Sequence, residues 1–304
     1  LHLRLGNAVA IKVLQLTGID GSMAAEMLVR FRQEATTIAR LRHPGIVAVL
    51  DYGAAPDGRP YIAMEFLEGR DLEQVLREDG VLSPARIATI VGTIAEVLDW
   101  THANGVVHRD IKPANVMLAR IGGEETIKVL DFGVARLVDV ATGALTDRTM
   151  VVGTAEYMAP EQIDGRASAI GPATDVYALA ATAYQLAAGE TPFRARDFAG
   201  VVGRKMAMKF PALAERRPEG GWEDVDAVLR RALAVAPEER PASATEFAGE
   251  LERALAGVGA SPPDADGPAR RADPAMQPTA LTPMPQRTVV DTSRGRKGPE
   301  RGRG

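Results

Sequence analysis

The chain has 304 residues, which is enough for a large hydrophobic core in one or two domains. Hydrophobic residues make up 46% of it, which argues against a disordered protein, and the absence of cysteine excludes disulfides, thiolate metal sites and a cysteine nucleophile. The net charge of −4 is too small to indicate nucleic-acid binding, and the most hydrophobic stretch, 178–188, is too short to span a membrane.

The first part of the chain predicts strands around one helix. In chain order, the predicted elements are a strand over 8–14, a helix over 23–41, and strands over 46–52 and 61–66. Gly6-Asn7 resembles a hairpin turn before the first strand, and His43-Pro44-Gly45 ends the helix. This order indicates a small α/β lobe.

From Asp71 onward the pattern is helical. Asp71 can cap a helix that runs to about Asp79. Ser83-Pro84 can begin the next helix, which runs to about Asn104. Three more helices are predicted over 175–188, 225–234 and 243–255.

The last part of the chain differs in composition. Residues 257–304 are rich in Pro, Gly, Ala and Arg and have few large hydrophobic side chains, so we expect them to be disordered. They carry a net charge of +3. The basic end, 294–303, is interpreted as a solvated linker or, alternatively, as a juxtamembrane segment.

Two short motifs carry most of the functional information. Residues 108–115 read H-R-D-I-K-P-A-N, and D-F-G begins sixteen residues after the asparagine. Asp110 can accept a proton from a hydroxyl, and Lys112 can neutralise a moving phosphate. Asn115 and Asp131 are hard oxygen ligands suited to Mg²⁺. The order and spacing of these residues predict a phosphoryl-transfer site.

These motifs resemble those of protein kinases, in particular the bacterial branch of the eukaryotic-type (Hanks-type) serine/threonine kinases. The resemblance covers about residues 9–255. It implies an α+β, two-lobed fold, with a small antiparallel-sheet lobe over 1–67, a larger, mostly helical lobe over 68–256 and the tail 257–304 outside. It also implies ATP and Mg²⁺ as cofactors, with the nucleotide between the lobes.

The resemblance gives roles to several residues of the catalytic lobe. Asp110 would orient the substrate hydroxyl and accept its proton, and Lys112 would bind the γ-phosphate, as in kinases specific for Ser/Thr. His108 is expected to pack against Phe132 rather than to act in acid–base chemistry. Further along the chain, Asp175 would brace the catalytic loop. Arg240 would form an ion pair with Glu161.

Lys12 stands in V-A-I-K, the string expected on the third strand of kinases. It would bind the α and β phosphates and pair with a helix carboxylate. Glu34 is the favoured partner because it shares a helix face with Ile38, and Glu26 is the rival. Taken alone, Lys12 is equally well explained as a surface lysine on an edge strand.

Residues 64–69 resemble the hinge between kinase lobes. Met64 would be the gatekeeper beside the adenine. The carbonyl group of Glu65 and the N–H group of Leu67 would bind the base.

Three more side chains are expected near the nucleotide. Ala10 and Met117 would pack on the two faces of adenine, although Met117 also suits a plain core position. Asp71 would reach the ribose, or would only cap its helix.

Arg109 directly precedes Asp110, and in the resembling family an arginine there marks kinases controlled by activation-loop phosphorylation. The loop would run from Asp131 to the A-P-E string that ends at residue 161. Thr146 and Thr149 are the candidate phosphorylation sites, whereas Thr154 is expected to contact the catalytic residues.

One part of the kinase pattern is missing. Kinases place a glycine-rich hairpin before the V-A-I-K strand, and here Gly6 is the only glycine among the eleven residues before Lys12. Because the chain also begins with Leu1, we expect a truncated piece of an active kinase, with natural loss of this lid as the alternative. The chain as printed would then bind ATP weakly and turn over slowly.

The main hypothesis is therefore an ATP- and Mg²⁺-dependent protein serine/threonine kinase that phosphorylates its own activation loop. Its partners would be protein substrates and a second copy of itself, without nucleic acid or a membrane span. The expected location is the cytoplasm, possibly as the cytosolic part of a membrane-anchored receptor kinase. The alternatives are a pseudokinase scaffold and, remotely, a small-molecule phosphotransferase, which would lack the G-T-x-x-Y-M-A-P-E segment at 153–161.

Overall fold

The computed structural model describes residues 8–14, 21–56, 58–132, 153–217 and 220–259. The chain divides into two units, 1–262 and 263–304, and all of the described residues belong to the first. The proposed division into segments 1–67, 68–256 and 257–304 stays a prediction.

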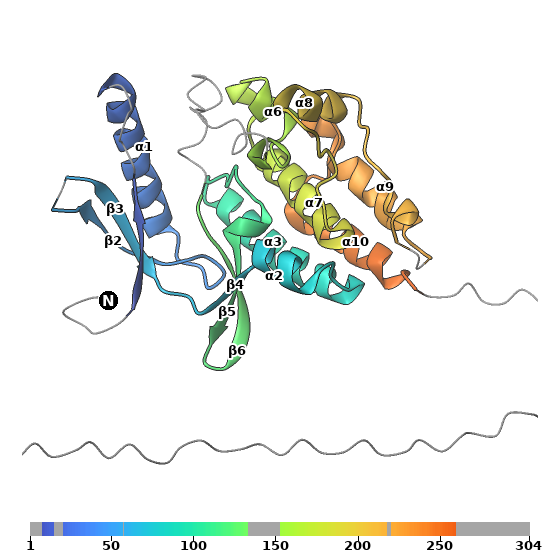
Figure 1. Ribbon diagram of the computed structural model, residues 1–304, viewed down its shortest axis with the longest axis horizontal. Helices are drawn as coiled ribbons and strands as arrows, with labels where there is room; N and C mark the ends of the chain where they lie inside the picture. The colour runs from blue at the N-terminus through green and yellow to red at the C-terminus, as the bar shows by residue number, and fades with distance from the viewer. Residues whose placement is uncertain (1–7, 15–20, 57, 133–152, 218–219, 260–304) are drawn as a thin grey trace, which may run out of the picture. The chain divides into compact units, whose positions relative to one another are not determined.

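In the described part of the N-terminal lobe, one helix lies beside a three-stranded antiparallel sheet (Figure 1). The strands are β1 (Val9–Val13), β2 (Val49–Ala54) and β3 (Pro60–Glu65), in the order β1-β3-β2. Helix α1 (Gly21–Arg40) packs on this sheet through Phe31 and Ala35, which contact Ile62 of β3. The α/β lobe predicted from the sequence is confirmed.

The second strand begins later than predicted. The sequence suggested a strand from Ile46, whereas β2 starts at Val49. Ile46 instead forms a parallel bridge with Val129, and the Val47 N–H donates to the Val129 carbonyl over 3.1 Å. The extended residues before β2 therefore join the N-terminal lobe to the strand that precedes D-F-G.

A second antiparallel sheet was not predicted. Its strands are β4 (Gly69–Asp71), β5 (Val116–Ile121) and β6 (Glu124–Val129), in the order β4-β5-β6. The turn between β5 and β6 is Gly122-Gly123, with φ angles of 63° and 91° that only glycine adopts readily. Two β-prone runs joined by Gly-Gly are a hairpin signal that the helical interpretation of this region overlooked.

The remaining elements are helices, and the caps predicted for the first two are present. The Asp71 side chain accepts a hydrogen bond from the Gln74 N–H at the start of α2 (Leu72–Asp79), and the Ser83 hydroxyl accepts one from the Arg86 N–H at the start of α3 (Pro84–Ala103). The later helices are α6 (Pro160–Ile163), α7 (Pro172–Ala188), α8 (Phe198–Met206), α9 (Glu223–Ala232) and α10 (Ala244–Ala256). Short 3₁₀ turns lie at Pro113–Asn115, Ala167–Ala169, Leu213–Glu215 and Pro237–Glu239.

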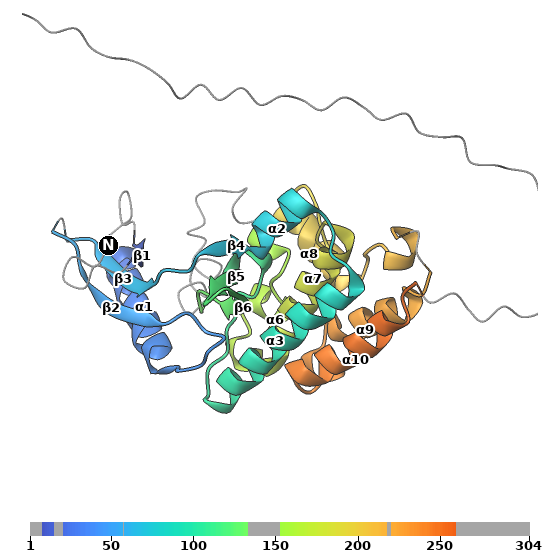
Figure 2. The same cartoon turned by 90° about the horizontal axis from the view of Figure 1, so that it is seen from below.

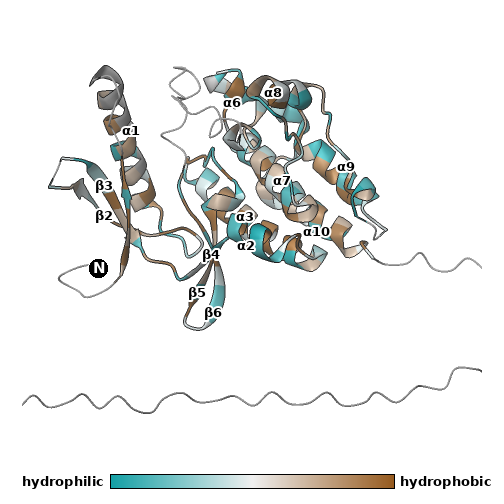
Figure 3. Ribbon diagram, in the orientation of Figure 1, coloured by the Kyte–Doolittle hydropathy of each residue, from teal (hydrophilic) through white to brown (hydrophobic). Residues whose placement is uncertain are grey.

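The core of the helical lobe is centred on α7. This helix is buried along most of its length, and α3 packs against both α7 and α10 (Figure 2). Figure 3 shows hydrophobic and hydrophilic residues sharing α9, as expected of a helix with one face on this core. Among the described helices, none combines the length and the hydrophobicity needed to cross a bilayer.

Candidate active site

The catalytic loop is held by a buried aspartate. Asp175, in the first turn of α7, is fully buried, and its two carboxylate oxygens accept hydrogen bonds from the His108 and Arg109 N–H groups over 2.7 Å each. His102 Nε2 lies 2.7 Å from the same carboxylate. Arg109 has a φ of 69°, a left-handed conformation that is costly for a non-glycine residue. These bonds therefore offset local strain and fix the backbone just before Asp110.

Asp110 is oriented by two neighbours. Asn115 Nδ2 donates to the Asp110 Oδ2 atom over 2.8 Å and to its carbonyl oxygen over 2.7 Å. Lys112 Nζ lies 3.2 Å from Asp110 Oδ2. The carboxylate is 8% exposed, so it keeps contact with solvent while its orientation is fixed. The structure thus brings together three residues predicted from one string.

Lys12 of β1 meets Asp131 across a separation of 119 residues. Its Nζ atom lies 2.9 Å from Asp131 Oδ1, and both side chains are about a third exposed. Asp131 has a φ of 45°, a second left-handed non-glycine residue beside the catalytic loop. The side chain of Glu34, the predicted partner of Lys12, lies outside the described residues.

The predicted adenine-binding residues lie on paired strands. Ala10 of β1 is opposite Met64 of β3, and Met117 of β5 is opposite Asp71 of β4. Asp71 also caps α2, so its side chain has the structural role that the sequence left open. Leu67 is half-buried and lies between these pairs, in the segment that joins β3 to β4.

An ion pair that was not predicted joins the hinge to the second sheet. Lys128 Nζ lies 2.7 Å from Glu65 Oε1, and the same oxygen accepts a hydrogen bond from the Ala48 N–H over 2.8 Å. Lys128 precedes D-F-G by three residues, but its partner is distant in sequence. No local pattern around it would have predicted this contact.

His108 packs as expected. Its ring lies 4.5 Å from the ring of Phe132, and Nε2 donates to the Leu130 carbonyl over 2.8 Å while Nδ1 accepts from the Asp110 N–H. Burial lowers the pKa of His108, which favours the neutral imidazole. The arrangement suits a packing role better than a proton-transfer role.

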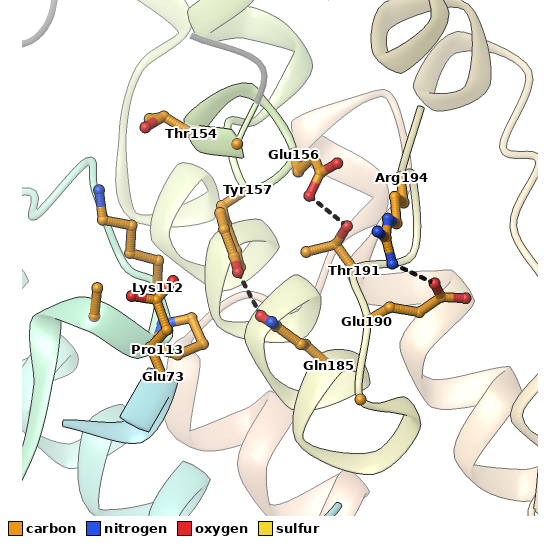
Figure 4. Close-up of a pocket in the computed structure, with 13 residues that line it drawn as sticks. Glu73, Lys112, Pro113, Thr154, Glu156, Tyr157, Gln185, Glu190, Thr191 and Arg194 are labelled. Atoms are coloured by element: carbon orange, nitrogen blue, oxygen red, sulfur yellow. Dashed lines mark hydrogen bonds and ion pairs between the residues drawn. The ribbon is translucent and has the colours of Figure 1, made fainter. Parts of the chain in front are cut away.

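A pocket of about 540 Å³ lies beside Lys112 (Figure 4). Thr154, Glu156 and Tyr157 line it from the segment that precedes α6. The Tyr157 hydroxyl donates to Gln185 Oε1 at the C-terminal end of α7, and burial raises the pKa of Tyr157. The pocket therefore places polar groups within reach of the catalytic loop.

The comparisons with known proteins agree with this geometry. The family described as "Protein kinase domain" matches residues 1–250 of the chain. The chain belongs to this protein kinase family.

Similar proteins narrow the assignment of this kinase domain. It is 35% identical to the serine/threonine-protein kinase PknB of Mycobacterium tuberculosis over 97% of this chain, and 35% identical to the serine/threonine-protein kinase pkn3 of Myxococcus xanthus over 95%. These alignments cover 47% and 52% of the two relatives, so the chain spans about half the length of the curated relatives it matches. The crystal structure of the Mycobacterium tuberculosis PknI kinase domain is similar, with a TM-score of 0.63, 33% identity and coverage of 84% of this chain and 88% of that one. The chain is thus a kinase domain of the bacterial serine/threonine type.

The donor set of the kinase domain suits a magnesium ion. Within the described part of the chain, the Asn115 side chain donates both of its hydrogen bonds through Nδ2, which leaves the amide oxygen for a cation, and Asp131 offers a carboxylate. Among the described residues, no group of three or more acidic or histidine side chains is placed to hold a metal ion. Such a two-ligand site fits Mg²⁺, which keeps several waters and shares the phosphates of its nucleotide.

Two further contacts hold α6, the short helix that follows the segment lining the pocket. Glu161 and Arg240 are fully buried and form a bidentate ion pair, with both N–O distances at 2.8 Å. Gln162 Nε2 donates to the Arg109 carbonyl over 2.9 Å. The ion pair was predicted, whereas the Gln162 contact was not, because an amide in a short helix has no distinctive sequence signal.

Several predicted features lie outside the described residues. They are the Gly6-Asn7 turn and the candidate phosphorylation sites Thr146 and Thr149. The absence of a glycine-rich hairpin also concerns this undescribed N-terminal stretch, so it stays a prediction.

Proposed function

We propose that this chain transfers the γ-phosphate of ATP to serine and threonine hydroxyls of proteins. The observation that carries the proposal is the presence of two oriented aspartates, each beside a lysine. Asp110 is oriented by Asn115 beside Lys112, and Asp131 is oriented beside Lys12. The first group can handle a hydroxyl proton and the second can hold charged phosphates.

The roles of the residues follow from their chemistry. Asp110 orients the attacking hydroxyl and accepts its proton, which contributes about 10²–10⁴-fold to the rate. Lys112 and Lys12 neutralise negative charge on phosphate oxygens. Mg²⁺, held by Asn115 and Asp131, would supply further neutralisation of that charge. Ala10, Met117, Glu65 and Leu67 would hold the adenine.

Regulation by autophosphorylation is part of the proposal. Arg109 Nε is buried and, within the described ranges, has no hydrogen-bond partner. A buried guanidinium nitrogen without a partner is costly, and a phosphate on Thr146 or Thr149 would supply a charge-assisted one. Such a modification between two copies of the chain requires a transient self-association.

The second candidate is a scaffold with the kinase fold and little catalysis. The residues printed before Lys12 contain no G-x-G-x-x-G string, and this candidate assumes that no such lid acts on the nucleotide. Backbone N–H groups of such a lid normally bind the phosphates. The scaffold predicts that ATP affinity does not change when Mg²⁺ is removed, whereas the kinase predicts that it falls.

Transfer to a substrate tests the proposal directly. The chain is incubated with Mg·ATP and a library of peptides that contain serine, threonine or tyrosine, and phosphorylated residues are identified by mass spectrometry. We expect phosphoserine and phosphothreonine with the parent and none with Asp110→Asn. A parent that binds Mg·ATP but phosphorylates no peptide would contradict the kinase and support the scaffold.

A further inference from the structure

Lys205 is a buried lysine that the proposed chemistry does not use. It lies on α8 and is fully buried, and burial lowers its pKa well below the usual value although nearby Glu156 raises it. None of the carboxylates in the described part of the chain forms an ion pair with it. A buried cation without an anionic partner is costly, so the position calls for a specific reason.

Polar groups around Lys205 match an ammonium ion. Its Nζ atom donates to the carbonyl oxygens of Glu156 and Met158 over 2.8 and 2.9 Å, and to the Tyr177 hydroxyl over 3.2 Å. It also lies over the rings of Tyr177 and Phe193, 4.7 and 4.8 Å from their centroids. Three acceptors suit the three donors of an ammonium group, and aromatic faces stabilise its charge.

The two carbonyl groups belong to the residues on either side of Tyr157. Glu156 and Tyr157 both line the pocket beside Lys112, as Figure 4 shows. The side chains of these two residues are held as well, because the Thr191 hydroxyl donates to Glu156 Oε2 over 2.7 Å and the Tyr157 hydroxyl donates to Gln185. Thr191 and Gln185 thus hold the side chains of Glu156 and Tyr157, whereas Lys205 holds the backbone of the same segment.

We propose that Lys205 is a positioning residue for the protein substrate. Its ammonium group ties the segment 153–159 to α8 and thereby holds Glu156 and Tyr157 in the pocket that receives the polypeptide around the phosphorylated residue. A hydrophobic side chain of similar length would fill the same space without tying these carbonyls. The inference rests on the proposed kinase function, since it assigns this pocket to the substrate.

Lys205→Met tests the role kinetically, because methionine keeps the length and loses the donors. Hydrogen bonds from a charged group are lost, so we expect the KM for a peptide substrate to rise by roughly tenfold while the KM for ATP does not change. Lys209→Met is the matched control, since Lys209 is exposed four residues further on, and it should leave both constants unchanged. A folded Lys205→Met with the parent's peptide KM, or with equal rises in both constants, would overturn the proposal.

Hydrogen exchange gives a readout that does not depend on activity. In the parent, the amides of 153–159 should exchange more slowly than the same amides in the unfolded chain, and this measurement does not require a folded variant. In Lys205→Met, exchange should rise in 153–159 and stay constant in the two sheets. Fast exchange of 153–159 in the parent, or no change in a folded variant, would refute the role. A parent that transfers no phosphate would contradict the proposed function, and the exchange data would still decide the role of Lys205.

Discussion

Removal of Arg240 from its ion pair with Glu161 is expected to destabilise the kinase domain strongly. Both side chains are fully buried and joined by two contacts of 2.8 Å, so Arg240→Met leaves a buried carboxylate without its cation, although the Thr174 hydroxyl still donates to it. Loss of one partner of such a pair costs about 3–5 kcal/mol of unfolding free energy. In a domain of this size the melting temperature would fall by roughly 6–20 °C.

The assay is thermal and urea unfolding followed by circular dichroism. Arg231→Met is the control, because Arg231 is 44% exposed and pairs with Glu246 and Glu250 at the surface, where solvent screens the charges and an ion pair contributes little to stability. A double variant, Arg240→Met with Glu161→Leu, should regain much of the loss because no unpaired charge stays buried. A folded Arg240→Met that loses less than about 1 kcal/mol would refute the reasoning.

The same ion pair predicts a dependence on pH. Burial raises the pKa of Glu161, but the hydrogen bonds from Arg240 and Thr174 lower it more, so the pKa in the folded state lies below the usual value. The pair therefore contributes its full stability above the unfolded-state pKa, and this contribution is lost as the pH falls through the folded-state pKa. The difference between the parent and Arg240→Met should accordingly shrink on acidification.

Three other variants test separate contacts. Lys12→Met removes the cation beside Asp131 and should weaken ATP binding by roughly tenfold in a titration, whereas unchanged affinity would contradict the nucleotide site. Lys128→Met leaves Glu65 without its ion pair and should lower the unfolding free energy by about 1–3 kcal/mol in urea, and a loss no larger than that of an exposed lysine would contradict the link. Burial lowers the pKa of His108, so folding stability should hold above about pH 6.5 and fall below it, and His108→Gln should reduce that fall. Equal pH profiles of the two proteins would show that His108 is not the group responsible.

Local sequence signals predicted the parts of the fold that depend on short-range chemistry. Asp71 and Ser83 cap the helices expected of them, because an N-cap needs only a side-chain oxygen and an N–H group three residues later. The H-R-D-I-K-P-A-N string predicted the cluster of Asp110, Lys112 and Asn115 for a similar reason, since the three residues are close neighbours in the sequence.

Long-range contacts were predicted only where the family pattern marked both partners. Arg240 and Glu161 are 79 residues apart, and each stands in a recognisable string. Lys128 and Lys205 have no such marker, and their partners become neighbours only when distant segments pack together. The strands β5 and β6 differ, because a local signal for their hairpin is present in the sequence. Gly122-Gly123 joins two β-prone runs, but the region was interpreted as helical.

The most direct measurement is transfer of label from γ-labelled ATP with Mg²⁺ to the chain itself, with Asp110→Asn as the control. The account predicts label in the parent on Thr146 or Thr149, and none in the variant, in which the carboxylate beside Lys112 becomes an amide. Equal labelling of both proteins would contradict the role of Asp110. No label in the parent, even with a glycine-rich hairpin fused upstream, would contradict the kinase activity.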